Sequence, residues 1–298
     1  MRVRLSILLA LLLLSLFGCA AGSAVDHMWL GDSNAKQNNW DTAIAEYQKA
    51  IDLKPDIPEA NRKLATAYNN RALKLIDKKD FSGALNDLNK AIALDPKLVE
   101  AYNNRGWAYN GTENYTLAIA DLNMAVQLGF NPDMANKNLA KVYNNQGRAF
   151  VIGQLYDSAL VSLNHAVDLD PTLADAYSNR GWALDRMRDW NQALTDLNRA
   201  LAIDPKLAFA YNNRGWAQYE LSNYDAALLD LNKAIELDPK MSESYMNRGV
   251  LYILMGKKDL SILDFKKVLE LTQEPVFVEQ AKRNIGIASS GATYMLYR

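Results

Sequence analysis

The 298-residue sequence contains a single cysteine and only two histidines, His27 and His165. One cysteine cannot form an intramolecular disulfide, and a cysteine-based zinc cluster needs several thiolates. The two histidines lie far apart, so no histidine-based metal cluster and no Ser-His-Asp triad is visible. A Gly-rich phosphate loop is also lacking. We therefore expect no metal, no cofactor and no catalytic residue.

An excess of charge of either sign is also missing. The sequence has 33 Lys and Arg against 34 Asp and Glu, which gives a net charge of −1. Binding to nucleic acid depends on a basic surface, so no nucleic-acid partner is indicated. Proline and glycine are few, 8 and 15, which argues against a disordered chain. Apolar residues make up 49% of the sequence, enough for a sizeable core.

The N-terminus has the composition of an export signal. Arg2 and Arg4 precede an apolar run at residues 5–17. A membrane-spanning helix needs about 20 apolar residues, whereas the apolar region of a signal peptide is shorter. We therefore predict that this segment directs export and is removed.

The run ends in the letters LFGC at residues 16–19. This motif resembles the lipobox of bacterial lipoproteins, in which the chain is cut before the cysteine and the cysteine is acylated. The resemblance implies a signal peptide at residues 1–18, a lipidated Cys19 and a short tether at 19–25. The alternative is an ordinary secretory signal cut at Ala21 or Ala24, which discards the cysteine.

The lipobox resemblance also bears on the location of the protein. Ala20 follows the cysteine, where an aspartate is associated with inner-membrane retention in enterobacteria. We therefore expect a lipid anchor in the bacterial cell envelope, with the outer membrane slightly favoured. The secretory alternative predicts a secreted or periplasmic protein.

A tyrosine-centred motif recurs along the rest of the sequence at intervals of 34, 41, 34, 34 and 34 residues. A first, degenerate copy precedes these by another 41 residues. Such a period predicts a repeat architecture before any other fold. The motif begins at Tyr68 (YNNRA), Tyr102 (YNNRG), Tyr143 (YNNQG), Tyr177 (YSNRG), Tyr211 (YNNRG) and Tyr245 (YMNRG).

The glycine, the later alanines and the terminal proline of each copy resemble the tetratricopeptide repeat. That resemblance implies an all-α, right-handed α-solenoid of about seven helix-turn-helix repeats. A solenoid would span residues 26–275, and residues 276–298 would form a capping helix and a tail. The repeats are expected near 24–57, 58–98, 99–132, 133–173, 174–207, 208–241 and 242–275.

Two of the repeats carry seven extra residues. Seven residues make almost two helical turns, so an insert of this length keeps the same face of a helix inward. The inserts at 58–64 and 132–139 are alike, PEANRKL and PDMANKNL, and the blocks that follow match at an offset of 75. We infer that a two-repeat block was duplicated and that each insert lengthens the first helix of its repeat.

Two features within the repeat have a structural interpretation. A recurring glycine lies where two helices approach closely, because a side chain there would push them apart. A recurring arginine is followed sixteen residues later by an aspartate, and where Gln146 replaces the arginine, Ser162 replaces the aspartate. We therefore predict ion pairs within repeats for Arg71–Asp87, Arg105–Asp121, Arg180–Asp196, Arg214–Asp230 and Arg248–Asp264.

A second stripe of the first helix is left for binding. Phe209, Asn213, Trp216 and Glu220 are spaced 4, 3 and 4, which places them on one face of a helix. Stacked repeats would align the equivalent positions along a concave groove. The candidate binding residues are Asn70, Asn104, Asn145, Asn179, Asn213, Asn247, Trp107, Trp182 and Trp216.

An asparagine amide both donates and accepts, so it can satisfy the main chain of an extended peptide, and tryptophan is enriched at binding hot spots. A similar asparagine ladder holds the peptide in the tetratricopeptide domain of the transferase that adds N-acetylglucosamine to Ser and Thr. Chaperone adaptors of the family instead grip a carboxylate with basic residues, and here only Lys141 and Arg148 approach that chemistry. Arg148 is included among the candidates.

Three functions compete. The first is an anchored scaffold or adaptor that binds extended segments of protein partners and assists assembly of an envelope complex, as some lipoproteins of this family do. A second is binding of glycan or peptidoglycan, with the tryptophans stacked on sugar rings. The weakest is an enzyme, because the carboxylates follow the repeat. A purely structural interpretation is also open, in which the asparagines only satisfy neighbouring groups and the tryptophans fill the seams between helices.

Overall fold

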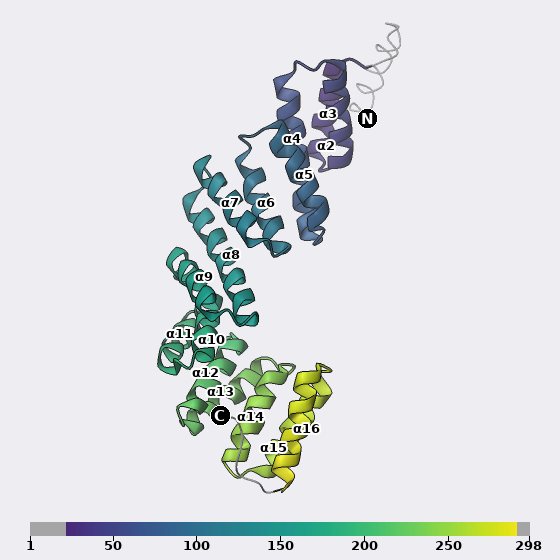
Figure 1. The fold of residues 1–298 in the computed structure, drawn as a ribbon. Coiled ribbons are helices and arrows are strands. Elements are labelled where there is room, and N and C mark those ends of the chain that lie inside the picture. The colour runs from purple at the N-terminus through teal and green to yellow at the C-terminus, as the bar shows by residue number, and fades with distance from the viewer. Residues whose placement is uncertain (1–21, 291–298) are drawn as a thin grey trace, which may run out of the picture. The chain divides into compact units, whose positions relative to one another are not determined.

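A computed structural model describes residues 22–290, and all regular structure in that range is helical (Figure 1). Helices are labelled as in Figure 1. The predicted signal peptide, Cys19 and the tail beyond residue 290 lie outside the described residues. Within the described range, no helix is both long enough and apolar enough to cross a membrane.

The protein divides into two compact units, with the boundary between Ala135 and Asn136. In the first unit the helices pair as α2 with α3, α4 with α5 and α6 with α7, and α4 also contacts α6. Pairing of adjacent helices and stacking of the pairs make this unit an α-solenoid, as predicted. Its helices are α2 (Ala24–Lys36), α3 (Trp40–Leu53), α4 (Pro58–Asp77), α5 (Phe81–Leu94), α6 (Val99–Gly111) and α7 (Tyr115–Gln127).

The second unit repeats the arrangement. Helices α10, α12, α14 and α16 each contact the next in that series, so the first helices of successive repeats line one face. Its helices are α8 (Pro132–Ile152), which begins just before the boundary, α9 (Tyr156–Leu169), α10 (Ala174–Arg186), α11 (Trp190–Ile203), α12 (Ala208–Glu220), α13 (Tyr224–Leu237), α14 (Ser242–Leu254), α15 (Lys258–Leu271) and α16 (Pro275–Ser290).

Proline ends the second helix of most repeats. At Asp204 the backbone turns extended, with φ −126° and ψ 99°, and Pro205 follows. Proline disfavours the α conformation in the residue before it, so the helix stops there. The same Asp-Pro step follows α5, α9 and α13.

The seven-residue inserts lengthen the first helix of their repeats, as predicted. Helix α4 has 20 residues and α8 has 21, whereas α6, α10, α12 and α14 have 13 each. The predicted capping helix is also confirmed. Helix α16 contacts α14 and α15 and buries Ala281 and Ala288 against Phe265 and Val268.

The recurring glycine allows close approach of the two helices in a repeat, as expected. A Cβ added to Gly215 would lie 2.9 Å from Cγ of Leu231 and 3.2 Å from the main-chain oxygen of Ala227. These distances leave no room for a methyl group. Equivalent crowding occurs at Gly106, Gly147, Gly181 and Gly249.

The predicted ion pairs are confirmed. In the sixth repeat Arg214 donates from Nε and Nη2 to the two carboxylate oxygens of Asp230, at 2.8 and 2.7 Å. Where both residues are replaced, Ser162 Oγ donates to Gln146 Oε1 at 3.0 Å, which preserves the link without charge. The same bidentate geometry holds for Arg71–Asp87, Arg105–Asp121, Arg180–Asp196 and Arg248–Asp264.

These arginines also connect successive repeats, which was not predicted. Nη1 of Arg214 donates to Oδ1 of Asn198 at 2.8 Å, sixteen residues earlier on the preceding second helix. Each arginine therefore bonds to its own repeat and to the one before. The other asparagine pairs are Arg105–Asn89, Arg180–Asn164 and Arg248–Asn232, and Arg71 bonds instead to Asp41 of the first repeat.

Candidate functional site

The ten candidate binding residues all lie on first helices of repeats. They are distributed over both units, so they do not form one cluster. Asn70 lies in α4, Asn104 and Trp107 in α6, Asn145 and Arg148 in α8, Asn179 and Trp182 in α10, Asn213 and Trp216 in α12, and Asn247 in α14.

Several of the asparagines hydrogen-bond to the preceding repeat. In the first unit, Nδ2 of Asn104 donates to Oδ1 of Asn69 at 2.8 Å. In the second unit, Asn179 donates in the same way to Asn144 at 2.8 Å, and Asn247 donates to Asn212 at 3.0 Å. The second asparagine of one motif thus bonds to the first asparagine of the motif before it. We call this series the asparagine ladder.

The ladder is interrupted between α10 and α12. The motif of α10 reads YSNRG, so Ser178 stands where the motifs of α4, α8 and α12 have the asparagine that accepts the ladder bond. Asn213 is only 6% exposed, and its Nδ2 has no hydrogen-bond partner, nor does Oγ of Ser178. The serine is too short to supply the missing acceptor. Asn213 therefore carries an unsatisfied buried donor, which costs about 1–3 kcal/mol.

Asn213 lines a cavity of about 760 Å³ in the second unit, which we call the groove. Its walls are the first helices α10, α12 and α14, together with α16, the end of α8 and the start of α9. Five aromatic residues line it, and two of them meet edge to face, with 5.4 Å between the ring centroids of Trp182 and Phe209. The aromatic residues are Tyr156, Trp182, Phe209, Trp216 and Phe277.

Aliphatic residues and further polar groups complete the lining. Met246 and Val250 of α14 and Val151 of α8 contribute apolar surface. From α16, Asn284 also lines the groove; it is 1% exposed and its Nδ2 lies 3.7 Å from Sδ of Met246. Its Oδ1 has no partner. The groove thus contains a buried donor and a buried acceptor that lack partners within the protein.

A buried carboxylate also lines the groove. Asp185 of α10 is 8% exposed, and its Oδ1 has no hydrogen-bond partner. Burial is the main cause that raises the pKa of this carboxyl to about 7; the nearby Arg186 opposes the shift and the charge of Glu220 adds to it. A carboxyl with this pKa gains or loses its proton near neutral pH.

Sequence reasoning missed Asp185 and Asn284. A signal for Asp185 exists, because the same position of the neighbouring repeats holds Val151, Tyr219 and Ile253. Val151 and Ile253 are buried apolar residues. A carboxylate at a position that otherwise packs against its neighbours is a departure that the repeat alignment reveals. Asn284 lies in the capping helix, outside the repeats, so no alignment could have indicated it.

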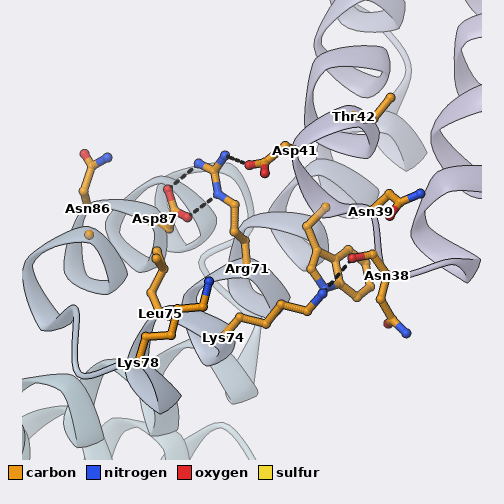
Figure 2. Close-up of a pocket in the computed structure, with 12 residues that line it drawn as sticks. Asn38, Asn39, Asp41, Thr42, Arg71, Lys74, Leu75, Lys78, Asn86 and Asp87 are labelled. Carbon is orange, nitrogen blue, oxygen red and sulfur yellow. Dashed lines mark hydrogen bonds and ion pairs between the residues drawn. The ribbon is translucent and has the colours of Figure 1, made fainter.

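The first unit has a cavity of different character, about 520 Å³, between α3, α4 and α5 (Figure 2). Arg71 donates to Asp87 on one side and to Asp41 on the other, with 2.7 Å from Nη1 to Oδ1 of Asp41. Lys74 donates to the main-chain oxygen of Asn38 at 2.7 Å. The charged groups in the middle of this cavity are therefore already paired.

Metal chemistry has no support in the part of the sequence that the structure describes. Within residues 22–290, no three side chains of the His, Cys, Asp and Glu types come together as a metal site would need. Besides Asp185 and the two amides, Tyr156, Arg186 and Glu243 bring polar or charged groups to the groove.

Comparison with protein families gives matches along most of the repeats. Models described as Tetratricopeptide repeat match residues 174–207 and 208–241 in one case and 99–128 and 242–275 in another. A model described as TPR repeat matches residues 31–70 and 72–112. Together they cover more than half of the chain. A comparison with curated proteins gives no match.

Solved structures of several repeat proteins are similar to this chain. PilF of Pseudomonas aeruginosa is 17% identical, with a TM-score of 0.57, over 74% of this chain and 96% of that one. A tetratricopeptide repeat protein of Parabacteroides merdae is 16% identical, with a TM-score of 0.51, over 88% and 98%. YrrB, a TPR protein with an unusual peptide-binding site, is 25% identical, with a TM-score of 0.46, over 66% and 95%. The first two likenesses show the fold.

Proposed function

Because the chain belongs to the tetratricopeptide repeat proteins, we propose that it is an interaction scaffold that binds an extended segment of a protein partner in the groove of its second unit. Proteins of this family mediate protein–protein interactions and are typically not enzymes. The observation that carries the proposal is the combination of aromatic walls with buried, unpartnered amide groups in one cavity.

A peptide backbone fits the unpartnered groups of the groove. Nδ2 of Asn213 needs an acceptor, and Oδ1 of Asn284 needs a donor. Backbone carbonyl and N–H groups supply both, whatever the sequence of the segment. Burying a side chain of the segment against Trp182 and Trp216 adds apolar contact at residue types that dominate binding energies. Ligand binding thus relieves the cost of the unpaired buried groups.

The other predicted asparagines have a different place in the proposal. Asn104 and Asn179 spend their Nδ2 groups on the asparagine ladder and are buried, so we assign them to holding the repeats together. Among the predicted asparagines, Asn213 and Asn247 line the groove, but Asn247 also donates its Nδ2 to the ladder, to Asn212. The binding residues that we propose are therefore Trp182, Asn213 and Trp216.

Site-specific photo-crosslinking in the native cell tests the proposal. A photo-reactive amino acid replaces Phe209 in the groove or, as a control, Lys78 in the cavity of the first unit. We expect position 209 to crosslink to a defined segment of one or a few proteins, mapped by mass spectrometry, and position 78 to give none of these products. Equal crosslinking from both positions, or no protein product from position 209, would contradict the proposal.

We also propose that the protein is exported and anchored by a lipid on Cys19. The support is the LFGC motif at residues 16–19, which ends an apolar run and contains the single cysteine of the sequence. Anchoring keeps the groove near envelope partners and raises their effective concentration. Metabolic labelling with a palmitate analogue should mark the wild type and not Cys19→Ala. A labelled variant, or an unlabelled wild type, would refute the anchor.

Glycan binding is a second candidate, and one observation favours it. Trp182 and Trp216 line the groove beside Asn213, and aromatic rings beside amides also suit sugar rings. Titration with soluble peptidoglycan fragments, followed by tryptophan fluorescence, separates the two functions. Saturable quenching that Trp216→Ala abolishes would favour the glycan, whereas an unchanged spectrum leaves the peptide.

A further inference from the structure

Asp185 is the exception among the buried aspartates of the described residues. Five of the others, the partners of the recurring arginines, each accept two hydrogen bonds from a guanidinium, as Asp196 does from Arg180 at 2.7 and 2.8 Å. Asp170 accepts from Thr172 at 2.6 Å. Only Asp185 has a carboxylate oxygen that is buried and without a partner. Asp185 is therefore the buried aspartate whose carboxylate needs a hydrogen-bond partner from outside the protein.

The repeat does not require a buried, unpaired carboxylate at the position of Asp185. The equivalent residues of the repeats before and after are Val151 and Tyr219, and a valine at this position is buried and well packed. Burying an unpaired carboxylate is costly, and an apolar residue of similar size would remove the cost. Unpaired ionisable groups held in a cavity are characteristic of functional sites.

The walls around this carboxylate favour a cation. Trp182 lies three residues before Asp185 on α10, so both side chains project from the same face of the helix. Phe209 meets Trp182 edge to face, and Trp216 and Phe277 line the same groove. Aromatic faces attract ammonium and guanidinium groups, most strongly when water is excluded.

We propose that Asp185 and these four aromatic rings form a socket for a positively charged side chain, lysine or arginine, of the segment that binds in the groove. The inference rests on the proposed function and specifies its ligand. The apolar stem of the basic residue packs between the rings, and its charged end bonds to the free oxygen of Asp185. Asn213 and Asn284 hold the adjacent backbone of the segment.

The other charged groups around the groove are consistent with a positively charged ligand. Glu243 of α14 lines the groove and is exposed, and Glu220 of α12 acts on the charge state of Asp185. Arg186 of α10 lines the groove but is exposed, and Oδ1 of Asp185 lacks any bond to it. Arg188 acts on Glu220. From α16 the lining residues are Phe277, Gln280 and Asn284, none of which titrates.

The ligand preference can be measured by a selection that needs no known partner. A random peptide library displayed on phage is selected against the full-length protein, and enriched peptides are synthesised with arginine, lysine, citrulline or glutamate at the enriched position. Citrulline keeps the shape of arginine and removes its charge. Binding is measured by fluorescence anisotropy for the wild type, Asp185→Asn and a control, Asp225→Asn, which changes an exposed carboxylate on α13.

We expect arginine or lysine at one fixed position of the enriched peptides. Replacing that arginine by citrulline should weaken binding to the wild type and to Asp225→Asn by about tenfold, because the cation loses both its carboxylate and its aromatic contacts. The same replacement should change binding to Asp185→Asn by less than about twofold. Binding of the arginine peptide to the wild type should strengthen between pH 6 and pH 8, as Asp185 ionises, whereas binding of the citrulline peptide should not.

Three other outcomes distinguish failure of the socket from failure of peptide binding in the groove. Enriched peptides that bind competitively with each other but carry no common basic residue would overturn the socket and leave the proposed function intact. A basic preference that Asp185→Asn retains would likewise overturn the role of Asp185. If no peptide is enriched over the same selection without the protein, both the socket and the peptide-binding function are contradicted.

Discussion

The two units contain similar repeats, yet their cavities differ in how their polar groups are satisfied. In the first unit, Arg71 joins Asp87 and Asp41, and Asn104 donates to Asn69, so the interior groups have partners within the protein. In the second unit, the groove contains unpartnered atoms of Asp185, Asn213 and Asn284. The same repeat thus builds a closed interior in one place and an incomplete one in the other. An incomplete interior is what a binding site requires.

Three sets of substitutions test this difference between the units. The largest effect is expected in the first unit, from Arg71→Gln. The side chain of Asp87 is 2% exposed, and without the guanidinium it becomes a buried, uncompensated charge. Breaking a buried ion pair in this way costs about 3–5 kcal/mol of unfolding free energy. Urea denaturation followed by tryptophan fluorescence measures the loss.

A matched double variant sharpens this first prediction. Arg71→Gln with Asp87→Ser copies the pair Gln146 and Ser162, which the protein itself uses in the fourth repeat. Because no buried charge is left, the double variant should lose clearly less stability than Arg71→Gln alone. A double variant as unstable as the single one would show that the ion pair is not the reason for the effect.

The next effect has the opposite sign and lies in the second unit. Asp185→Asn should stabilise the protein at pH 8, because the buried carboxylate is ionised there at a cost. The pKa of about 7 in the folded protein lies above the unfolded value of 3.8, so the folded state holds the extra proton between about pH 4 and pH 7. Stability is therefore lost as pH rises through 7, by up to about 4 kcal/mol.

The pH dependence provides the test of that prediction. Urea denaturation at pH 5 and pH 8 should show that the wild type loses stability over this range and that Asp185→Asn loses less. The two proteins should be closest in stability at pH 5. If Asp185→Asn is destabilised at pH 8, the carboxylate has a stabilising partner within the protein and the socket is not free.

The smallest effects are expected when an acceptor of the asparagine ladder is added in the second unit and one is removed in the first unit. Ser178→Asn supplies the acceptor that Asn213 lacks and should add about 1 kcal/mol of stability. Asn69→Ser removes the acceptor of Asn104 and should cost about 1–2 kcal/mol. Thermal unfolding of both variants measures the two changes in stability. Shifts of the same sign would show that the two positions are not equivalent.

Much of the fold follows from comparing the repeats with one another. The joint replacement of an arginine and an aspartate by Gln146 and Ser162 revealed the ion pairs, because only residues in contact need to change together. The seven-residue inserts predicted longer helices, because a whole number of near-turns preserves the inward face. Both inferences concern contacts that every repeat makes.

The site was harder to predict because it depends on departures from the repeat. The aligned asparagines suggested a uniform ladder open to a ligand, but donation from Asn104 to Asn69 depends on how far apart neighbouring helices lie. That distance is a property of packing and not of spacing along the sequence. The serine at position 178 and the aspartate at 185 are visible in the alignment, but their burial is not. Burial decides that their groups lack partners.

The most direct test of the account measures one peptide against two variants. A groove-selected peptide is titrated into the wild type, Ser178→Asn and Asn69→Ser, and its affinity is compared by fluorescence anisotropy. Because Ser178→Asn occupies the free donor of Asn213, we expect it to weaken binding by about tenfold, the cost of one good hydrogen bond, while Asn69→Ser leaves the affinity unchanged. Equal affinity for all three proteins would contradict the claim that the unpaired groups of the second unit hold the ligand.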